Sequence, residues 1–265
     1  METVDSDYDF SHVHASLDKY VQDDLLVMAA SVVLDGQDIV DVHLAGHQDR
    51  EAERLIQADS IYRIYSSTKL ITSCAAMMLW EEGQFQLDDP LRDYLPELGS
   101  LNVVKDGAND VGLVEPVAVE PTIRQLMCHN AGFSYGLFAE SLVDPIYTAA
   151  GVSAPTATLE DMVRKLGDIP LAYQPGRRWQ YSVSVDVLGR LIEILSGLRF
   201  GEFLSQRIFE PLGMIDTDFH VPTEKHDRLC ANYAPVNMLD PMEPGLNVVP
   251  DTLFCLLYTS PSPRD

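Results

Sequence analysis

The chain has 265 residues, and 46% of them are hydrophobic, which predicts a folded globular protein with a sizeable core rather than a disordered chain. It carries 18 basic and 41 acidic residues, for a formal net charge of -23 at pH 7. This negative charge argues against binding to a nucleic-acid backbone or to an anionic membrane surface.

The N-terminal part predicts one amphipathic helix followed by a β-hairpin. The helix is expected over residues 11–24, where apolar side chains recur at helical spacing. These side chains are Val13, Leu17, Tyr20 and Val21. The dipeptide Asp35-Gly36 is a strong hairpin turn, so residues 29–46 predict two antiparallel strands. A polar link over residues 47–59 follows.

An almost wholly apolar run comes next. From Leu70 to Trp80 only Thr72 and Ser73 are polar, so this run predicts a helix that is buried on most sides. Lys69 stands at its start. Because an unpaired buried charge is costly, this lysine is expected either to reach water or to have a function.

The middle of the chain predicts short helices separated by an extended insertion. A short helix is expected to run from Leu87 toward Tyr94. Residues 99–121 have little helical period and are expected to be extended. Another short helix is expected over 122–129, and Asn130-Ala131-Gly132 ends it.

The second half predicts three further helices. Thr158 and Asp161 form a capping box that opens the first of them, and Gly167 closes it. Gly197 follows the second helix, and Pro211 stops the third. The helices are expected at 158–167, 184–195 and 200–209, and a short strand-like piece is expected near 215–220.

The predicted sheet is incomplete, because a two-stranded hairpin alone is only marginally stable. Further strands are therefore expected after residue 250. The segment CLLYTSPSPRD, residues 255–265, has no periodic pattern and resembles translated sequencing-adaptor read-through. We therefore expect a partial domain over residues 1–254 and a non-native tail over residues 255–265, so that the natural protein differs after about Phe254.

Ser66 and Lys69 form the motif S-x-x-K at the beginning of the apolar run. On a helix, residues three apart share a face, so the lysine amine is expected near the serine hydroxyl. An amine that accepts a proton can activate serine as a nucleophile, and the first helical turn favours developing negative charge. The alternative is structural, because serines before an apolar run are ordinary helix N-caps.

Tyr181 is a second candidate, because it follows a Pro-Gly turn and precedes a predicted helix. A phenol near an ammonium is stabilised as phenolate and can act as a base. Tyr181 could equally be a core aromatic whose hydroxyl bonds to the backbone, and spacing alone does not decide.

Other polar residues have simpler interpretations. His12 and His14 could ligate a metal, but no third ligand lies nearby, and we predict no metal site and no cofactor. His129 beside Cys128 is read as a structural histidine, since adjacent helical residues point in different directions. The pair Asp88-Asp89 precedes a proline and is read as a turn former.

Four stretches of the chain resemble the serine β-lactamase-related family, which contains class C β-lactamases, DD-peptidases and family VIII carboxylesterases. The stretches, in the expected order, are 62–98, 122–136, 173–197 and 203–222. The wordings RIYSSTK, HNAGFSYG and YSVSVDVLGR are closest to the esterase branch. The resemblance covers most of the chain and is far more specific than S-x-x-K alone.

The resemblance implies an α+β fold, in which an antiparallel sheet is flanked by helices and joined to a mostly helical lobe. The C-terminal strands of that sheet are expected to be missing from this chain. Ser66 would be the acylated nucleophile and its N–H one oxyanion donor. Lys69 would be its activating partner. Tyr181 would be the general base and later the general acid.

Two departures from the family pattern affect the expected activity. The third position of the Y-x-N motif is Val183, which weakens a β-lactam interpretation and favours esters. No K-T-G, H-x-G or W-x-G motif occurs, although the family strand with this motif supplies the second oxyanion donor. Losing one such donor costs about a hundred- to a thousandfold in rate, so the chain as written is expected to be poorly active.

The sequence thus predicts a serine hydrolase that cleaves small carboxylic esters. The alternatives are a β-lactamase or D-amino-acid peptidase, and a non-catalytic binding protein on the same scaffold. The expected partner is a small-molecule ester or amide, with no nucleic acid and no membrane. The four cysteines share no short spacing, and the acidic N-terminus lacks an apolar signal core. Free thiols and a cytoplasmic location are therefore expected.

Overall fold

The structure is a computed structural model that describes residues 3–5, 7–136, 141–154 and 157–249. It divides into two compact units. The first unit comprises Met1–Arg63 and Val221–Cys255, and the second consists mainly of Ile64–His220. The predicted tail at 255–265 lies outside the described residues.

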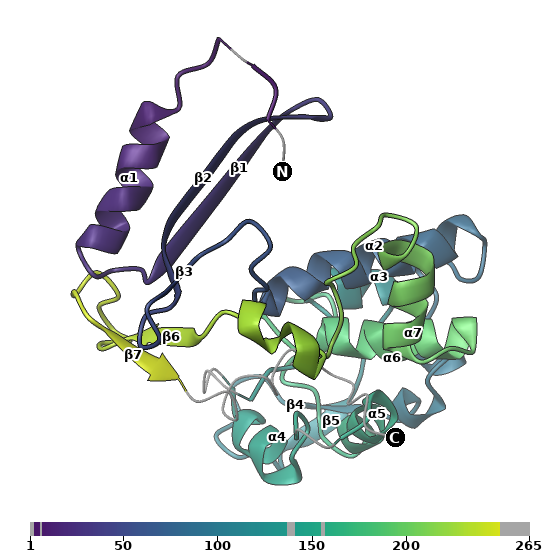
Figure 1. The fold of residues 1–265 in the computed structure, drawn as a ribbon. Helices are drawn as coiled ribbons and strands as arrows, with labels where there is room; N and C mark the ends of the chain where they lie inside the picture. Colours follow the sequence, from purple (N-terminus) through teal and green to yellow (C-terminus); the bar gives the residue numbers. More distant parts are fainter. Residues whose placement is uncertain (1–2, 6, 137–140, 155–156, 250–265) are drawn as a thin grey trace. The chain divides into compact units, whose positions relative to one another are not determined.

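The first unit is built on a three-stranded antiparallel sheet (Figure 1). Its strands are β1 (Met28–Asp35), β2 (Asp38–Asp49) and β3 (Arg54–Leu55), in the order β1-β2-β3. The predicted turn is confirmed: Gly36 has φ +63, and β1 and β2 pair from Asp35 with Asp38 to Met28 with Gly46. Helix α1 (Ser11–Gln22) forms where the sequence predicts it and lies against β1 and β2, although none of its residues is buried.

A second small sheet, which the sequence did not predict, completes this unit. After η5 (Thr223–Arg228), strands β6 (Asn232–Pro235) and β7 (Leu246–Val249) pair in antiparallel fashion. Ala231 N–H donates to the Gln48 carbonyl at 2.7 Å and ties the start of β6 to β2. The C-terminal part of the described chain therefore returns to the N-terminal sheet.

The second unit is mostly helical. Its helices are η1 (Tyr65–Ser67), α2 (Thr68–Glu81), η2 (Leu91–Asp93), η3 (Pro96–Leu98), α3 (Ile123–Met127), α4 (Asp144–Ala150), α5 (Leu159–Gly167), α6 (Ser184–Ser196), α7 (Phe200–Leu204) and the π-helical turn η4 (Ser205–Phe209). The insertion predicted to be extended contains strands β4 (Asn102–Val104) and β5 (Val114–Pro116), which pair with each other.

Helix α6 is the centre of this unit, because it packs against α2, α3, α5 and α7. Its apolar stripe predicted this burial, and Val187, Leu188 and Leu191 have no exposed surface. The predicted capping box of α5 is also confirmed, since Thr158 Oγ1 accepts from Asp161 N–H at 3.0 Å. The first turns of α2 and α6 carry the candidate site residues or lie directly beside them.

Two expectations about this unit are wrong. The segment 215–220 forms turns rather than a strand, because its backbone hydrogen bonds are local, from Ile215 N–H to Gly213 and from Thr217 N–H to Met214. Helix α2 is buried on one face only, since α6 covers that face while Leu70 on another face is 73% exposed.

Among the residues that the structure describes, no helix combines the length and the apolar character needed to cross a bilayer. The three described cysteines are free thiols.

Candidate active site

The structure brings the three predicted site residues together within the helical unit. Ser66 Oγ and the Tyr181 hydroxyl are 2.7 Å apart, although 115 positions separate them in the chain. Lys69 Nζ donates to Ser66 Oγ at 3.5 Å. The same ammonium lies 5.0 Å from the centre of the Tyr181 ring. A hydroxyl, a phenol and an amine therefore share one small region, which is the geometry that proton transfer from serine requires.

Ser66 lies in a turn that leads directly into α2. The turn is the 3₁₀ helix η1, and α2 begins at Thr68. Tyr65 has φ +41, a left-handed conformation that is uncommon for residues other than glycine. Such backbone strain often accompanies functional positions, because the surrounding structure must hold it in place. The turn places Ser66 and Lys69 on neighbouring helical turns at the N-terminal end of α2.

Aromatic rings hold Tyr181 in position. The His129 ring stacks on it at 5.0 Å, and the Tyr135 ring lies 5.2 Å away. The Trp179 ring, at 6.5 Å, is on the solvent side, and this residue is 66% exposed. The Lys69 ammonium lies 5.7 Å from the Tyr135 ring as well. The rings restrict the phenol and offer their faces to the lysine charge.

His129 is neutral at ordinary pH. Burial, together with the charge of Lys69, lowers the pKa of its imidazole to about 4. Ser182 N–H donates to His129 Nδ1 at 3.2 Å, so the single proton of the neutral ring is on Nε2. His129 also has φ +54, which bends the chain after α3. The structural interpretation made from the sequence fits these contacts, and the structure adds the stacking on Tyr181.

A buried polar network positions the segment that carries Tyr135. Asp144 accepts hydrogen bonds from the Ser134 hydroxyl, from Gly136 N–H at 3.1 Å and from Ser141 N–H at 2.9 Å. Gln180 Nε2 donates to Ser134 Oγ at 2.7 Å and so links this network to the residue before Tyr181. Sequence reasoning missed the network. The one sequence feature that pointed to this network was an Asp-Pro pair at the start of a short helix.

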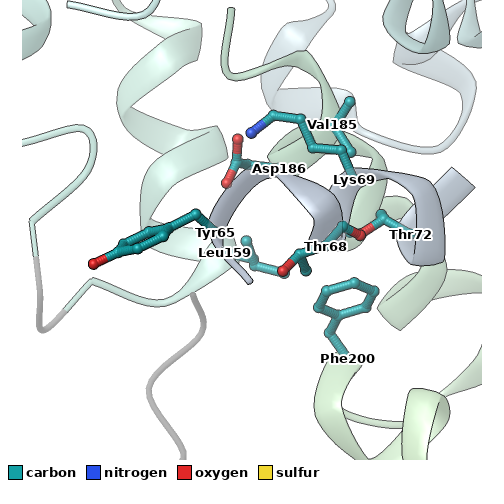
Figure 2. A pocket seen from close by; sticks show the side chains of 9 residues that line it. Tyr65, Thr68, Lys69, Thr72, Leu159, Val185, Asp186 and Phe200 are labelled. Carbon is teal, nitrogen blue, oxygen red and sulfur yellow. The ribbon is translucent and has the colours of Figure 1, made fainter. Parts of the chain in front are cut away.

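Asp186 was also missed. It lies in the first turn of α6, and its carboxyl points toward the Lys69 ammonium (Figure 2). Both residues line a small cavity of about 20 Å³, to which Thr68 and Thr72 also contribute. Burial raises the pKa of the Asp186 carboxyl to about 6, and the charge of Lys69 opposes that rise. The sequence feature that could have pointed to Asp186 is that it is a single acidic residue within the apolar stripe that follows Tyr181.

The remaining candidates lie elsewhere and have structural partners. His14 Nε2 is 2.8 Å from Asp41, and its ring stacks on His43 at 4.2 Å in the first unit. Asp88 pairs with Arg124 at 2.7 Å. Within the described ranges, no three His, Cys, Asp or Glu side chains form a group that could hold a metal ion.

A comparison with protein families places most of the chain in one of them. The family model described as Beta-lactamase matches residues 13–254. Esterase EstB of Burkholderia gladioli is 30% identical over 240 residues, which are 88% of this chain and 58% of that protein. Lovastatin esterase of Penicillium rubens is 33% identical over 194 residues, which are 73% of this chain and 47% of that protein. The chain thus spans about half the length of these curated relatives.

Solved structures agree with this comparison at the level of the fold. EstCE1, described as a hydrolase with promiscuous acyltransferase activity, has a TM-score of 0.76 at 23% identity and covers 91% of this chain and 59% of its own. Unliganded simvastatin synthase from Aspergillus terreus has a TM-score of 0.73 at 23% identity, with coverage of 90% and 61%. These similarities show an α+β fold of the β-lactamase and transpeptidase type.

Proposed function

Because this chain belongs to the beta-lactamase family, we propose that it is a serine hydrolase that cleaves small carboxylic esters through an acyl-enzyme on Ser66. The observation that carries the proposal is the contact of Ser66 Oγ with the Tyr181 hydroxyl at 2.7 Å, beside Lys69. Relatives named as esterases support acyl transfer from ester substrates.

The proposed reaction has two halves that use the same groups. Ser66 Oγ attacks the ester carbonyl while its proton passes to Tyr181 or Lys69, and the Ser66 N–H stabilises the resulting oxyanion. The tetrahedral intermediate collapses as the leaving alcohol takes up that proton. A water molecule then attacks the acyl-enzyme and gives its proton to the same base. The bond between the acyl carbon and Ser66 Oγ breaks, the acid leaves, and the base returns the proton to Ser66 Oγ.

Val183 favours an ester substrate over a β-lactam. Val183 occupies the position at which the family's Y-x-N motif has an amide, and it is 1% exposed. A buried valine offers no hydrogen bond to a substrate, so the amide contact of a β-lactamase has no equivalent there. We further expect slow turnover by this chain, because its sequence contains none of the family motifs that supply the second oxyanion donor.

A fluorophosphonate probe tests the nucleophile directly. The chain should be labelled once, at Ser66, as peptide mapping by mass spectrometry would show. Ser66→Ala should abolish the labelling, while Ser67→Ala, the matched change one residue later, should retain it. Absence of labelling in the folded wild-type chain would contradict the proposal and favour a non-catalytic binding protein.

A substrate comparison tests the reaction class. We expect hydrolysis of p-nitrophenyl butyrate to exceed hydrolysis of nitrocefin, and Ser66→Ala to remove both. Faster cleavage of nitrocefin would overturn the ester assignment in favour of a β-lactamase, while leaving the nucleophile in place.

A further inference from the structure

Trp179 is a large aromatic residue that the proposed mechanism does not use. It lies two positions before Tyr181 and is 66% exposed. Single exposed apolar side chains are common, so exposure alone indicates nothing. The position of this side chain is informative, because its ring lies 6.5 Å from the Tyr181 ring and 6.2 Å from the His129 ring. An apolar surface is therefore open to solvent beside the candidate active site.

The backbone on both sides of Trp179 is fixed. The next residue, Gln180, is buried, and its N–H donates to the His129 carbonyl at 2.9 Å. Three residues before Trp179, the Gly176 N–H donates to the Asn130 carbonyl at 2.8 Å. An aromatic side chain on a fixed segment loses little conformational freedom when a ligand covers it, so the cost of binding there is small.

The faces of the indole are not covered by another ring. In the part of the chain that the structure describes, its ring contacts are with His129, which is T-shaped at 67°, and with Tyr181, which is tilted at 42°. Neither ring stacks flat on the indole. The neighbouring Arg178 is engaged with other residues, since its guanidinium lies 4.7 Å from the centre of the Tyr173 ring and donates to Gln180 Oε1 at 3.1 Å. The indole is therefore able to stack on a planar ligand.

The chemistry of Tyr181 decides which part of an ester lies near this indole. The Tyr181 hydroxyl is 2.7 Å from Ser66 Oγ, and in the proposed reaction the leaving oxygen takes up a proton beside it. That oxygen must then lie next to Tyr181, so the carbon group bonded to it extends on the Tyr181 side of Ser66. The acyl chain is bonded to the carbonyl carbon and extends from there in another direction. Trp179 thus lies on the side of the leaving group.

We propose that Trp179 is a specificity-determining residue that stacks on the leaving group, and that the preferred substrates are esters of phenols and arylmethyl alcohols. An aromatic leaving group gains a ring contact that an alkyl group of similar size does not. The inference rests on the proposed function and deepens it. The bonds are those of the proposed reaction: Ser66 Oγ bonds to the acyl carbon, the bond from that carbon to the leaving oxygen breaks, and the leaving oxygen takes the proton.

A pair of phosphonate probes tests the inference without turnover. Both carry the same alkyl phosphonyl group and both phosphonylate Ser66, but one releases fluoride and the other releases p-nitrophenol. We expect Trp179→Ala to slow labelling by the p-nitrophenyl probe about tenfold more than labelling by the fluoride probe, because only the aryl leaving group loses a stacking contact. Lengthening the alkyl chain of the phosphonyl group should change the labelling rate by the same factor in Trp179→Ala and in wild type.

Trp80 supplies the matched control, because it is the only other tryptophan in the sequence. It lies near the C-terminal end of α2, about 17 Å along the helix axis from Lys69. Trp80→Ala should leave the ratio of the two labelling rates unchanged. The same unchanged ratio in Trp179→Ala would overturn the inference. Equal slowing of both probes would then mean that the indole only restrains Tyr181, and the proposed function would stand.

A binding measurement decides if neither probe labels Ser66, in which case the proposed function fails, or if Trp179→Ala does not fold. The ligand is p-nitrobenzyl alcohol, whose nitro group quenches indole fluorescence on contact. In Trp80→Phe, where Trp179 is the remaining indole, quenching should saturate as the alcohol is added. In Trp179→Phe, which retains only Trp80, quenching should not saturate. Equal quenching in the two variants, without saturation, would overturn the inference.

Discussion

At the scale of single residues, the site depends on groups that are kept in one charge state. His129 is kept neutral by burial and by Lys69, and it stacks on Tyr181 while Ser182 N–H occupies its Nδ1. Asp186 is kept ionised at neutral pH although burial opposes the charge. Both residues make the stability of the fold depend on pH. Burial shifts both pKa values, and it lowers that of His129 while it raises that of Asp186, so the two residues change the stability in opposite directions as the pH falls.

His129 should destabilise the fold as the solution becomes acidic. Its folded pKa of about 4 is below the ordinary 6.5, so between these values the unfolded chain binds a proton that the folded chain does not. Stability should therefore fall as the pH falls from 6.5 toward 4, by about 1–2 kcal/mol after screening at a partly exposed site. In His129→Asn, which keeps an acceptor and tolerates positive φ, urea unfolding should show a smaller loss. An identical acid dependence would contradict this cause.

Asp186 should destabilise the fold at high pH. Its folded pKa of about 6 is above the ordinary 3.8, so stability rises as the pH falls through 6 toward 4. Asp186→Asn should therefore raise the free energy of unfolding by about 1–3 kcal/mol at pH 8, with the gain vanishing near pH 4. Urea denaturation at the two pH values measures it. A variant that is less stable than wild type at pH 8 would show that burial is not the main cost.

At the scale of elements, the loop from His129 to Gly136 positions the aromatic rings at the site. Gly132 has φ +96, and a Cβ there would lie 2.5 Å from the Tyr173 carbonyl oxygen. The loop therefore needs glycine for two reasons, conformation and space. It is held on its other side by the buried Asp144 network.

Gly132→Ala should cost more stability than a glycine change that is only conformationally strained. Gly197, after α6, has φ +70, and no atom lies within 4 Å of the place that an added methyl group would take, so Gly197→Ala should cost about 1–2 kcal/mol. Gly132→Ala adds the clash and should cost more, with slower fluorophosphonate labelling of Ser66. Urea unfolding of both variants provides the comparison, and equal losses would show that the loop moves freely to accept the methyl group.

Helix α5 offers an independent check on local stabilisation. Its capping box joins Thr158 and Asp161, and its apolar face is buried. Thr158→Ala should lower the free energy of unfolding by about 1 kcal/mol, because one N–H at the helix start loses its partner. The rate of Ser66 labelling should not change. A loss below experimental error would indicate that packing against α6 alone stabilises this helix.

At the scale of the whole molecule, the formal charge of -23 should dominate the response to salt. The described ion pairs are mostly exposed, such as Asp88 with Arg124, and such pairs contribute little. Raising the ionic strength from about 0.01 M to about 0.15 M shortens the Debye length from about 30 Å to about 8 Å, which screens the repulsion. The urea midpoint should therefore rise. A fall would mean that attractive pairs outweigh the net repulsion.

Much of the fold could be predicted because its signals are local. The Asp35-Gly36 turn, the Thr158–Asp161 capping box and the apolar stripe of α6 each involve residues a few positions apart, and all three are confirmed. The strand expected near 215–220 was wrong, since alternating residues form a strand only where another strand is available for pairing. Strands β6 and β7, which pair with each other, were missed because each has only four residues and carries a weak pattern.

The sequence by itself determined the family, the S-x-x-K motif and the helices that carry it, because these depend on spacing along the chain. Only the tertiary structure decided which side chains meet. Ser66 and Tyr181 are in contact because α2 packs on α6, and no local pattern encodes a contact across 115 positions. The same packing sets Asp186 opposite Lys69.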